Sequence, residues 1–355
     1  MKQSVPFQFD AISLVTFNFS ASYIGGGRKR LDAFAQWFDA HGGARFLIHP
    51  ACEGLRDRFP NNRYWTVRTT RLQRLLSNFK YLREVRRETP DLYYSCGIPI
   101  PYPIGRVNWL HVNNVLPLTN HHLPITAFDR FKRLVLGPRL RASAKWCEVV
   151  SVMSESSVRL IGHSFAQKAV VSVQGSNDEL AFLGTSQSKG QTEPTVIVVG
   201  TWKYKALNDA LTVFNWLRSQ DSELRMHIFG PTQFVPTRLR RDKSIHLRGV
   251  VEHAQVIQEL RGARFYLSTT RLENAYGSAA EGIFLAPEAL ISDIPPHREL
   301  LSGEPFETVH VPGLNRAMLR VRRRLLTGVN LRTWDSVIAE MLNITQYRLG
   351  SVVRC

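Results

Sequence analysis

Residues 263–292, ARFYLSTTRLENAYGSAAEGIFLAPEALIS, carry the pattern that decides the fold. The segment 263–268 is apolar and typical of a buried strand, and so is the segment 288–292. Between them, residues 277–286 form a short segment of helical character that begins with small residues. A strand, a helix and a second strand in this order indicate a βαβ unit, which belongs to a parallel sheet.

The same alternation of strands and helices extends in both directions from this unit. It predicts an α/β fold with two doubly wound, Rossmann-like domains, in agreement with a length that suits about two domains. The other predicted strands are 9–17, 45–49, 107–112, 148–153, 169–173, 195–200, 225–230 and 245–250, and the helices are 28–40, 68–89, 206–220, 253–261 and 333–347.

The polar stretch 175–194, which is rich in Gly and Ser and contains a Pro, predicts a linker. We therefore expect four parts in the chain. An N-terminal domain spans 1–176, a linker spans 177–194, and a C-terminal domain spans 195–328. The last part, 329–355, contains a helix that we expect to pack back on the first domain.

The charge of the chain is strongly positive. There are 46 Lys and Arg residues against 29 Asp and Glu residues, a net charge of +17. The excess is uneven, with net +11 over residues 1–180 and +6 over the remainder. Such a balance indicates an anionic partner, which leaves nucleic acid, an anionic membrane surface and phosphorylated ligands open.

The cysteines and the terminal segment predict the compartment. The four cysteines are far apart and form no CxxC pair, which argues against a zinc site and against a disulfide framework. Asp10 interrupts the first apolar stretch, so we expect no signal peptide. No run of about 18 apolar residues exists to span a membrane. We expect a cytoplasmic protein.

Two glutamates stand out in the segment RLENAYGSAAEG (271–282). Glu273 falls in the predicted loop between strand and helix, and Glu281 about one turn inside the helix that Gly277 opens. The free N–H groups of such a helix start favour phosphate, and a carboxylate one turn further can accept two hydrogen bonds from a ribose diol. The alternative is a pair of solvated glutamates, since acidic residues are favoured at helix starts.

These motifs carry a resemblance to a known family. The stretch from RGVVEH (248–253) to SDIPPHREL (292–300) resembles the donor-binding half of the retaining glycosyltransferases of family 4, which have the GT-B fold. Those enzymes share two glutamates separated by seven residues, as Glu273 and Glu281 are. The resemblance continues in VVGTWKYKALNDAL (198–211), VSVQGSNDELAF (171–182) and VVSVMSESSVRLI (149–161), and covers about 150–301 well.

The resemblance implies roles for the residues of the C-terminal domain. Glu281 would hold the nucleotide ribose and Glu273 would contact the transferred sugar. The backbone N–H groups of Asn274, Ala275, Tyr276 and Gly277 would lie against sugar and diphosphate. The loop that starts at Gly249 would read the nucleotide base.

A lysine would neutralise the donor diphosphate. The family has an Arg and a Lys after the first strand of this domain, whereas this chain has Lys203 and Lys205 and no Arg at the usual position. Both lysines therefore remain candidates for the diphosphate contact, and Lys203 is the candidate for a catalytic role.

In the N-terminal domain the resemblance points to two places. The loop with Gly25, Gly26 and Gly27 would let the backbone approach the diphosphate and the acceptor, with help from Arg28 or Lys29. It is not a GxGxxG motif, so a nicotinamide site is weakly supported. His111 ends a predicted strand and would contact the sugar; the alternative is a histidine satisfied in the core.

The activity that these features imply is a retaining, metal-independent hexosyl transfer from a nucleotide-diphosphate sugar. The sequence has no DxD triplet to hold Mn²⁺ or Mg²⁺, and we expect neither a metal nor a cofactor. The acceptor would be a glycan, or a glycan on a lipid pyrophosphate, in surface-polysaccharide synthesis of the O-antigen or capsule type.

Two basic runs predict contact with an anionic membrane surface. Residues 63–87 contain eight Lys or Arg and one Glu, and residues 316–326 are also basic. Each such cation near an anionic leaflet contributes about 1 kcal/mol, which predicts a peripheral protein at the inner face of the plasma membrane.

Two alternatives remain open. A basic nucleic-acid-binding protein fits the charge, but no RRM, KH or helix-turn-helix signature is present, so we expect no nucleic-acid partner. The other keeps the fold and changes the reaction, to a nucleotide-sugar epimerase or a phosphorylase.

Overall fold

The computed structural model describes residues 12–68, 79–119, 125–162, 165, 167–183, 193–274 and 277–352. The chain divides into two compact units. Unit 1 consists of Met1–Asn120, Phe128–Gly175 and Trp334–Cys355, and unit 2 consists of Ser176–Thr333 with a short segment that ends at Ala127. The last helix therefore belongs to unit 1.

Unit 1 is built on a seven-stranded sheet in the order β3-β2-β1-β4-β5-β6-β7, with every pairing parallel. Its strands are nearly all buried, because helices cover both faces of a parallel sheet. The strands are β1 (Val15–Asn18), β2 (Arg45–Ile48), β3 (Arg63–Thr66), β4 (Leu92–Cys96), β5 (Val107–His111), β6 (Val149–Val152) and β7 (Ala169–Val171).

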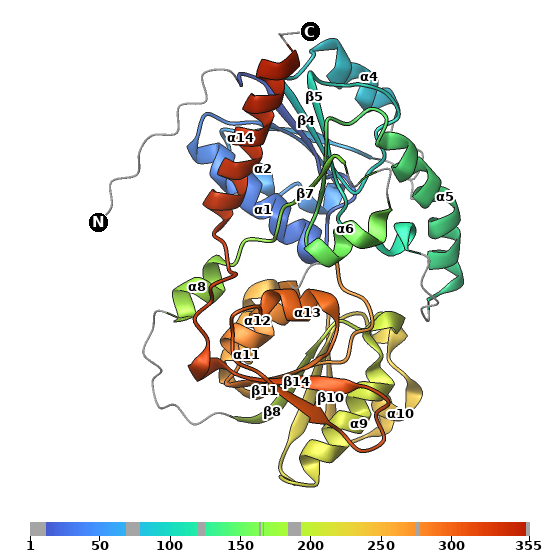
Figure 1. Cartoon of the computed structure of the whole chain (residues 1–355), viewed down its shortest axis with the longest axis vertical. Coiled ribbons are helices and arrows are strands. Elements are labelled where there is room, and N and C mark those ends of the chain that lie inside the picture. The colour runs from blue at the N-terminus through green and yellow to red at the C-terminus, as the bar shows by residue number, and fades with distance from the viewer. Residues whose placement is uncertain are drawn as a thin grey trace. The chain divides into compact units, whose positions relative to one another are not determined.

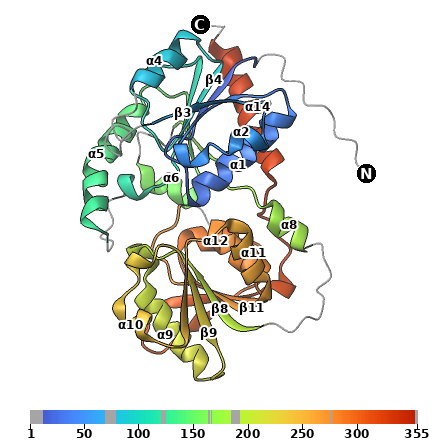
Figure 2. The ribbon, with the colours of Figure 1, turned by 180° about the vertical axis from the view of Figure 1, so that it is seen from behind.

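The helices of unit 1 lie on both faces of this sheet (Figure 1). Right-handed crossovers place the helices before and after β2 on one face, and those between β3 and β7 on the other. Figure 2 shows the same separation from behind. The helical segments are α1 (Gly25–Ala40), η1 (Pro50–Cys52), α2 (Leu55–Arg58), α4 (Phe79–Arg87), η2 (Leu116–Leu118), α5 (Ala127–Ser143), α6 (Glu155–Ile161) and α14 (Trp334–Val352).

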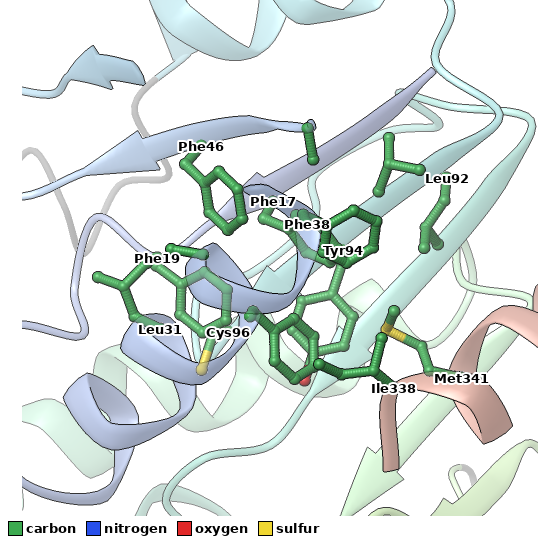
Figure 3. Packing of buried hydrophobic residues seen from close by; sticks show 14 of the residues in the cluster. Phe17, Phe19, Leu31, Phe38, Phe46, Leu92, Tyr94, Cys96, Ile338 and Met341 are labelled. Carbon is green, nitrogen blue, oxygen red and sulfur yellow. The ribbon is translucent and has the colours of Figure 1, made fainter. Parts of the chain in front are cut away.

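An aromatic core fills the space between the sheet, α1 and α14 (Figure 3). The ring of Phe17 lies 5.0 Å from that of Phe46 and 4.9 Å from that of Phe38, measured between centroids. Ile338 and Met341 of α14 belong to the same buried cluster, although they follow Phe46 by more than 290 residues in sequence. This packing attaches the last helix to unit 1.

Unit 2 contains a seven-stranded sheet in the order β10-β9-β8-β11-β12-β14-β13. Its first five strands are parallel, and β14 and β13 add an antiparallel edge. The strands are β8 (Glu193–Val199), β9 (Arg225–Phe229), β10 (Ile245–Gly249), β11 (Ala263–Ser268), β12 (Glu288–Ser292), β13 (Glu307–His310) and β14 (Ala317–Arg322).

The helices α9 and α10 pack on one face of this sheet, where a second apolar core lies, and α11 and α12 cover the other face. The helical segments of unit 2 are α8 (Asn177–Leu183), η3 (Lys203–Lys205), α9 (Leu207–Arg218), η4 (Thr232–Phe234), α10 (Thr237–Arg241), α11 (His253–Gly262), α12 (Gly277–Leu285), α13 (Pro295–Leu300) and η5 (Arg323–Leu325).

This architecture confirms the predicted fold class, two parallel-rich, Rossmann-like sheets with helices. Helix α6, which follows β6, begins at a serine: the Ser154 hydroxyl accepts a hydrogen bond from the N–H of Ser157 at 3.2 Å. Among the described residues, no helix combines the length and the apolar character needed to cross a bilayer.

Several expected elements differ in the structure. Gly25, Gly26 and Gly27 form the first turn of α1 rather than a loop before it. The expected linker begins with the helix α8, and its residues 184–192 lie outside the described part. Of the helix expected over 68–89, the structure describes α4 over Phe79–Arg87, and residues 69–78 lie outside the described part. The basic run 63–87 begins with the strand β3.

Three strands escaped the sequence analysis for a physical reason. β3, β13 and β14 lie at or near sheet edges and carry exposed or charged side chains, so they lack the continuous apolar run of a central strand. β4 was missed although it is fully buried, because its residues LYYSC mix aromatic and polar side chains.

Candidate active site

The candidate site lies at the carboxyl edge of the sheet of unit 2. From β8 the chain runs outward to β9 and β10, and then returns to β11 on the other side of β8. Such a reversal of strand order leaves a crevice between the loops that follow the two neighbouring strands, where ligands of open parallel sheets bind. The loops after β8 and β11 carry Lys205 and Glu273.

The side chains of these two residues form an ion pair in which the Lys205 ammonium donates to the Glu273 carboxylate. Both are largely shielded from solvent, with 11% and 13% of the side chains exposed. The Lys205 stem lies over Gly200, where an added Cβ would come within 3.1 Å of the Lys205 Cε. Gly200 also has φ +96°, so two features of the loop require glycine here.

Hydrogen bonds between the two loops fix this pair in place. The Thr269 hydroxyl donates to the carbonyl oxygens of Lys205 and Ala206, both at 3.1 Å. The Arg271 N–H donates to the carbonyl oxygen of Tyr204 at 2.8 Å. Hydrogen bonds therefore join the two loops that carry the ion pair. This lowers the entropic cost of keeping the two side chains in position.

Lys203 has a different environment. It is exposed and borders a pocket of about 370 Å³ between the loop after β8 and the start of α9. Trp202 and Phe234 line the same pocket, with ring centroids 4.7 Å apart. The sequence left both lysines as candidates for the diphosphate contact and gave Lys203 the catalytic role, whereas in the structure Lys205 is the lysine that pairs with Glu273.

Glu281 is one turn inside α12, as the sequence predicts, and only 6% of the residue is exposed. Its Oε1 atom lies 2.8 Å from Nε2 of His253, the first residue of α11. Figure 1 shows that α11 and α12 lie next to each other. His253 was not among the predicted site residues. It follows the end of β10 by four residues, and this place after a strand end was the available signal.

Tyr266 and Gly282 hold α12 against the sheet. Tyr266 is fully buried on β11, and burial raises the pKa of its phenol. A Cβ added at Gly282 would lie 2.1 Å from the Tyr266 ring, so only glycine lets the helix approach the ring this closely. This contact fixes the distance of Glu281, the preceding residue, from the sheet.

His297 of α13 is fully buried behind the site. Its Nδ1 atom lies 2.7 Å from the Ser292 carbonyl oxygen, which fixes Nδ1 as the protonated nitrogen of the neutral ring. Burial, with a smaller effect of the nearby Lys205 and Arg316 cations, lowers the pKa of His297 to about 4.

The remaining residues predicted in this domain lie at the same carboxyl edge of the sheet, after β11 or at the end of β10. Asn274 is buried directly after Glu273, and Gly277 is the first residue of α12. Gly249 ends β10 with φ +72°, and no atom lies within 4 Å of the position of an added Cβ, so its backbone is open to a ligand. Ala275 and Tyr276 lie outside the described residues.

In unit 1 the predicted glycines gather at the start of α1. An added Cβ on Gly26 would lie 3.1 Å from the Gln174 side chain, and one on Gly27 would lie 2.8 Å from the Asn113 side chain. Gly25 has φ +62° and open space around it. The first turn of α1 thus presents backbone N–H groups beside side-chain amides.

The side chains of Arg28 and His111 make contacts within unit 1. The guanidinium of Arg28 donates to both oxygens of Asp32 at 3.0 Å and to the Cys52 sulfur at 3.3 Å. His111 is fully buried, with its Nδ1 atom 2.8 Å from the Ser151 hydroxyl, and burial lowers its pKa well below the usual value. Its environment is that of a core histidine.

Among the residues that the structure describes, no three His, Cys, Asp or Glu side chains gather in the manner of metal ligands. In unit 2, the predicted residues Lys205 and Glu273 form one pair, and the predicted Glu281 forms a second pair with His253. The predicted residues of unit 1 separate into a glycine-rich helix start and two side chains engaged in internal contacts.

Comparisons with known proteins agree with this architecture. No protein-family pattern matches the sequence, and no curated protein matches it either. Among solved structures, HepE of Anabaena, in complex with UDP and glucose, is 13% identical, with a TM-score of 0.54 over 95% of this chain and 94% of that one.

Two further structures have a comparable similarity. OtsA in its apo form is 10% identical, with a TM-score of 0.53 over 82% of this chain and 87% of that one. A putative UDP-N-acetylglucosamine 2-epimerase from Listeria monocytogenes is 9% identical, with a TM-score of 0.51 over 81% of each chain. At such identities the likeness shows the fold alone, which is the GT-B fold of two Rossmann-like domains.

Proposed function

We propose that this protein is a glycosyltransferase that moves a sugar from a nucleotide-diphosphate donor to a glycan acceptor. The observation that carries the proposal is the cluster at the carboxyl edge of β8 and β11, where the Lys205–Glu273 pair and the His253–Glu281 pair flank the start of α12. A GT-B fold alone would not specify a reaction, because folds host many functions.

The proposed donor contacts follow from the charges of this cluster. The Lys205 ammonium and the first N–H groups of α12, which have no acceptor within a helix, suit a diphosphate. The Glu281 carboxylate, held by His253, suits the two hydroxyls of a ribose. Glu273 pairs with Lys205 and precedes the start of α12 by four residues. We propose that its carboxylate accepts a hydrogen bond from a hydroxyl of the transferred sugar.

In the proposed reaction the bond between the sugar C1 and the diphosphate oxygen breaks, and a bond forms between C1 and an acceptor hydroxyl on the same face. The acceptor proton passes to the departing diphosphate oxygen, so the configuration at C1 is retained. Negative charge grows on the diphosphate in the transition state, and fixed donors such as Lys205 lower the barrier most effectively there. We propose that these donors replace a metal ion.

For the acceptor we propose a glycan carried on a lipid pyrophosphate, in surface-polysaccharide synthesis, and a peripheral position at the cytoplasmic face of the membrane. The net charge of +17 supports an anionic surface as a partner. The glycine-rich start of α1 in unit 1, with its open backbone at Gly25, is the proposed contact for diphosphate and acceptor.

A second candidate is a nucleotide-sugar epimerase, because the structural likeness to the Listeria epimerase is nearly as high as that to HepE. The two candidates differ in their products. An epimerase converts a nucleotide sugar without an acceptor, whereas a transferase releases free nucleoside diphosphate only as sugar leaves it.

The test is a binding screen followed by product analysis. Thermal unfolding is measured with UDP, GDP, ADP, CMP and TDP, with and without EDTA, starting from UDP because HepE was crystallised with it. A ligand at a hundredfold excess over its Kd stabilises the folded state by about 2.7 kcal/mol. Stabilisation by one diphosphate, unchanged by EDTA, supports the proposed donor site.

The matching nucleotide sugar is then incubated with the protein and followed by NMR. Conversion to an epimer without an acceptor would replace the transferase with the epimerase. No stabilisation by any diphosphate, combined with binding to oligonucleotides, would replace both with a nucleic-acid-binding protein.

A further inference from the structure

Helix α5 of unit 1 has an unusual distribution of side chains. Phe128, Phe131 and Leu134 lie on its outer side and are 44%, 46% and 76% exposed. On a surface helix the large apolar residues normally point into the core. Here three of them, spaced three residues apart, point to solvent and form a continuous stripe with Pro138 one turn further on.

Cations flank this stripe on both sides. At about 100° per residue, Arg130 falls on one side of the apolar stripe, and Lys132 and Arg139 fall on the other. The Lys132 ammonium lies 4.6 Å from the centroid of the Phe128 ring, so charge and apolar surface are in direct contact. The helix contains five Lys or Arg residues and one Asp.

The opposite face anchors the helix to unit 1. A Cβ at Gly137 would lie 2.4 Å from the Pro117 carbonyl oxygen, so the backbone packs directly on η2. The Ser143 hydroxyl accepts from the Ile100 N–H at 2.8 Å. The Lys168 ammonium donates to the carbonyl oxygens of Ala144 and Cys147, just past the last turn. These contacts hold the inner face of α5 in place, so the apolar stripe on its outer face stays exposed.

The other basic segments lack this combination. In the run 316–326, Arg316 pairs with Asp209, Arg320 with Glu288 and Arg322 with Glu307. In α4, the apolar residues Leu82 and Val85 are buried, which leaves Phe79 as the exposed large one. In α5, Lys132 lies 3.8 Å from Asp129, and the five cations against one Asp still leave the helix strongly positive. Among the described residues, α5 is the segment that combines a row of exposed large apolar side chains with flanking cations.

We infer that α5 is a docking helix for an anionic lipid bilayer, lying in the plane of the interface with Phe128, Phe131 and Leu134 in the acyl region. An amphipathic helix binds such an interface through its buried apolar area and through attraction of its cations to anionic headgroups. Cations on both sides of the stripe match a headgroup layer that surrounds an inserted helix. This assignment rests on the proposed function, in which an anionic membrane is a partner, and identifies α5 as the part of the protein that contacts the membrane.

The test is sedimentation of the purified protein with vesicles of phosphatidylcholine, alone or mixed with phosphatidylglycerol. We expect binding to the mixed vesicles and weak binding to phosphatidylcholine alone. The triple variant Phe128→Ser, Phe131→Ser, Leu134→Ser should lose most of this binding. Replacing Arg130, Lys132 and Arg139 with Gln should weaken it by about fivefold for each cation.

Two controls test the location. Tyr347→Ser removes an equally exposed large side chain, 74% exposed, from α14 and should bind like the wild type. Replacing Lys80, Arg83 and Arg87 of α4 with Gln removes the same charge and should weaken binding less than the α5 charge variant. Equal losses in the two charge variants would overturn the inference in favour of general electrostatic attraction.

Two other outcomes would also overturn it. Absence of vesicle binding is one, and the other is a dimer in analytical ultracentrifugation that the Phe128, Phe131 and Leu134 variant abolishes, since the stripe would then contact a second copy. Urea unfolding checks that the variants fold. No nucleotide or sugar enters these assays, so their outcome is distinguishable from failure of the proposed transferase activity.

Discussion

Lys205 and Glu273 are 68 positions apart in sequence, yet their side chains form an ion pair between the loops that follow two adjacent strands. The pair is brought together because β8 and β11 are neighbours in the sheet although β9 and β10 intervene in the chain. Lys203, two residues from Lys205, borders a separate pocket. This difference between the two lysines leads to the first prediction.

Lys205→Ala should weaken binding of the nucleoside diphosphate identified by thermal shift, by roughly tenfold to a hundredfold, because a hydrogen bond to a charged group contributes about 1.5–3 kcal/mol. Lys203→Ala is the matched control and should bind nearly like the wild type. Isothermal titration calorimetry measures both. Equal losses in the two variants would contradict the assignment of the diphosphate to Lys205.

The two glutamates should separate binding from turnover. Glu281→Gln should weaken nucleoside diphosphate binding by about tenfold, since the ribose hydroxyls lose a charged acceptor. Glu273→Gln should leave that binding nearly intact and lower kcat with the sugar donor by about a hundredfold. Calorimetry and a donor-hydrolysis or transfer assay give the two quantities, and the assignment fails if Glu273→Gln loses the nucleotide instead.

Gly282→Ala should destabilise unit 2. The added methyl group would lie 2.1 Å from the ring of Tyr266, which is fully buried. We expect a cost of about 1–3 kcal/mol in the free energy of unfolding, as for other overpacked cores. Gly262→Ala is the control, because no atom lies within 4 Å of its added Cβ. Urea unfolding that gave the same midpoint for both variants would argue against this close packing.

The protein should lose stability in mild acid through His297. The pKa of the folded residue is about 4, whereas the unfolded chain has the ordinary value of 6.5. The unfolded state therefore takes up a proton first, and stability falls as the pH decreases from about 6.5 to about 4, by up to about 3 kcal/mol. His111, whose pKa is lowered by burial as well, acts in the same direction.

His297→Asn keeps a donor for the Ser292 carbonyl oxygen and removes the titration. Its unfolding midpoint in urea should decline less than that of the wild type between pH 7 and pH 5. Parallel declines of wild type and variant would show that His297 does not carry the acid sensitivity.

Much of the fold was predictable from local patterns. The apolar strands β5, β6, β8 and β11 and the helices α9 and α11 follow from hydrophobic runs and their period. The helix α5 was not predicted, because its large apolar side chains do not gather on one buried face. The position of Glu281 one turn inside α12 follows from Gly277 and the strand before it. Edge strands such as β13 were not predictable in the same way, since an exposed strand needs no apolar run.

The sequence by itself determined the class of the central apolar strands and the polar residues that follow their ends, because burial of a parallel sheet demands apolar strands and leaves polar residues to the loops. Tertiary structure alone decided which of them meet. Strand order pairs Lys205 with Glu273, helix packing pairs Glu281 with His253, and the anchored inner face of α5 leaves Phe131 exposed. Such contacts join residues far apart in the chain, and no local pattern specifies them.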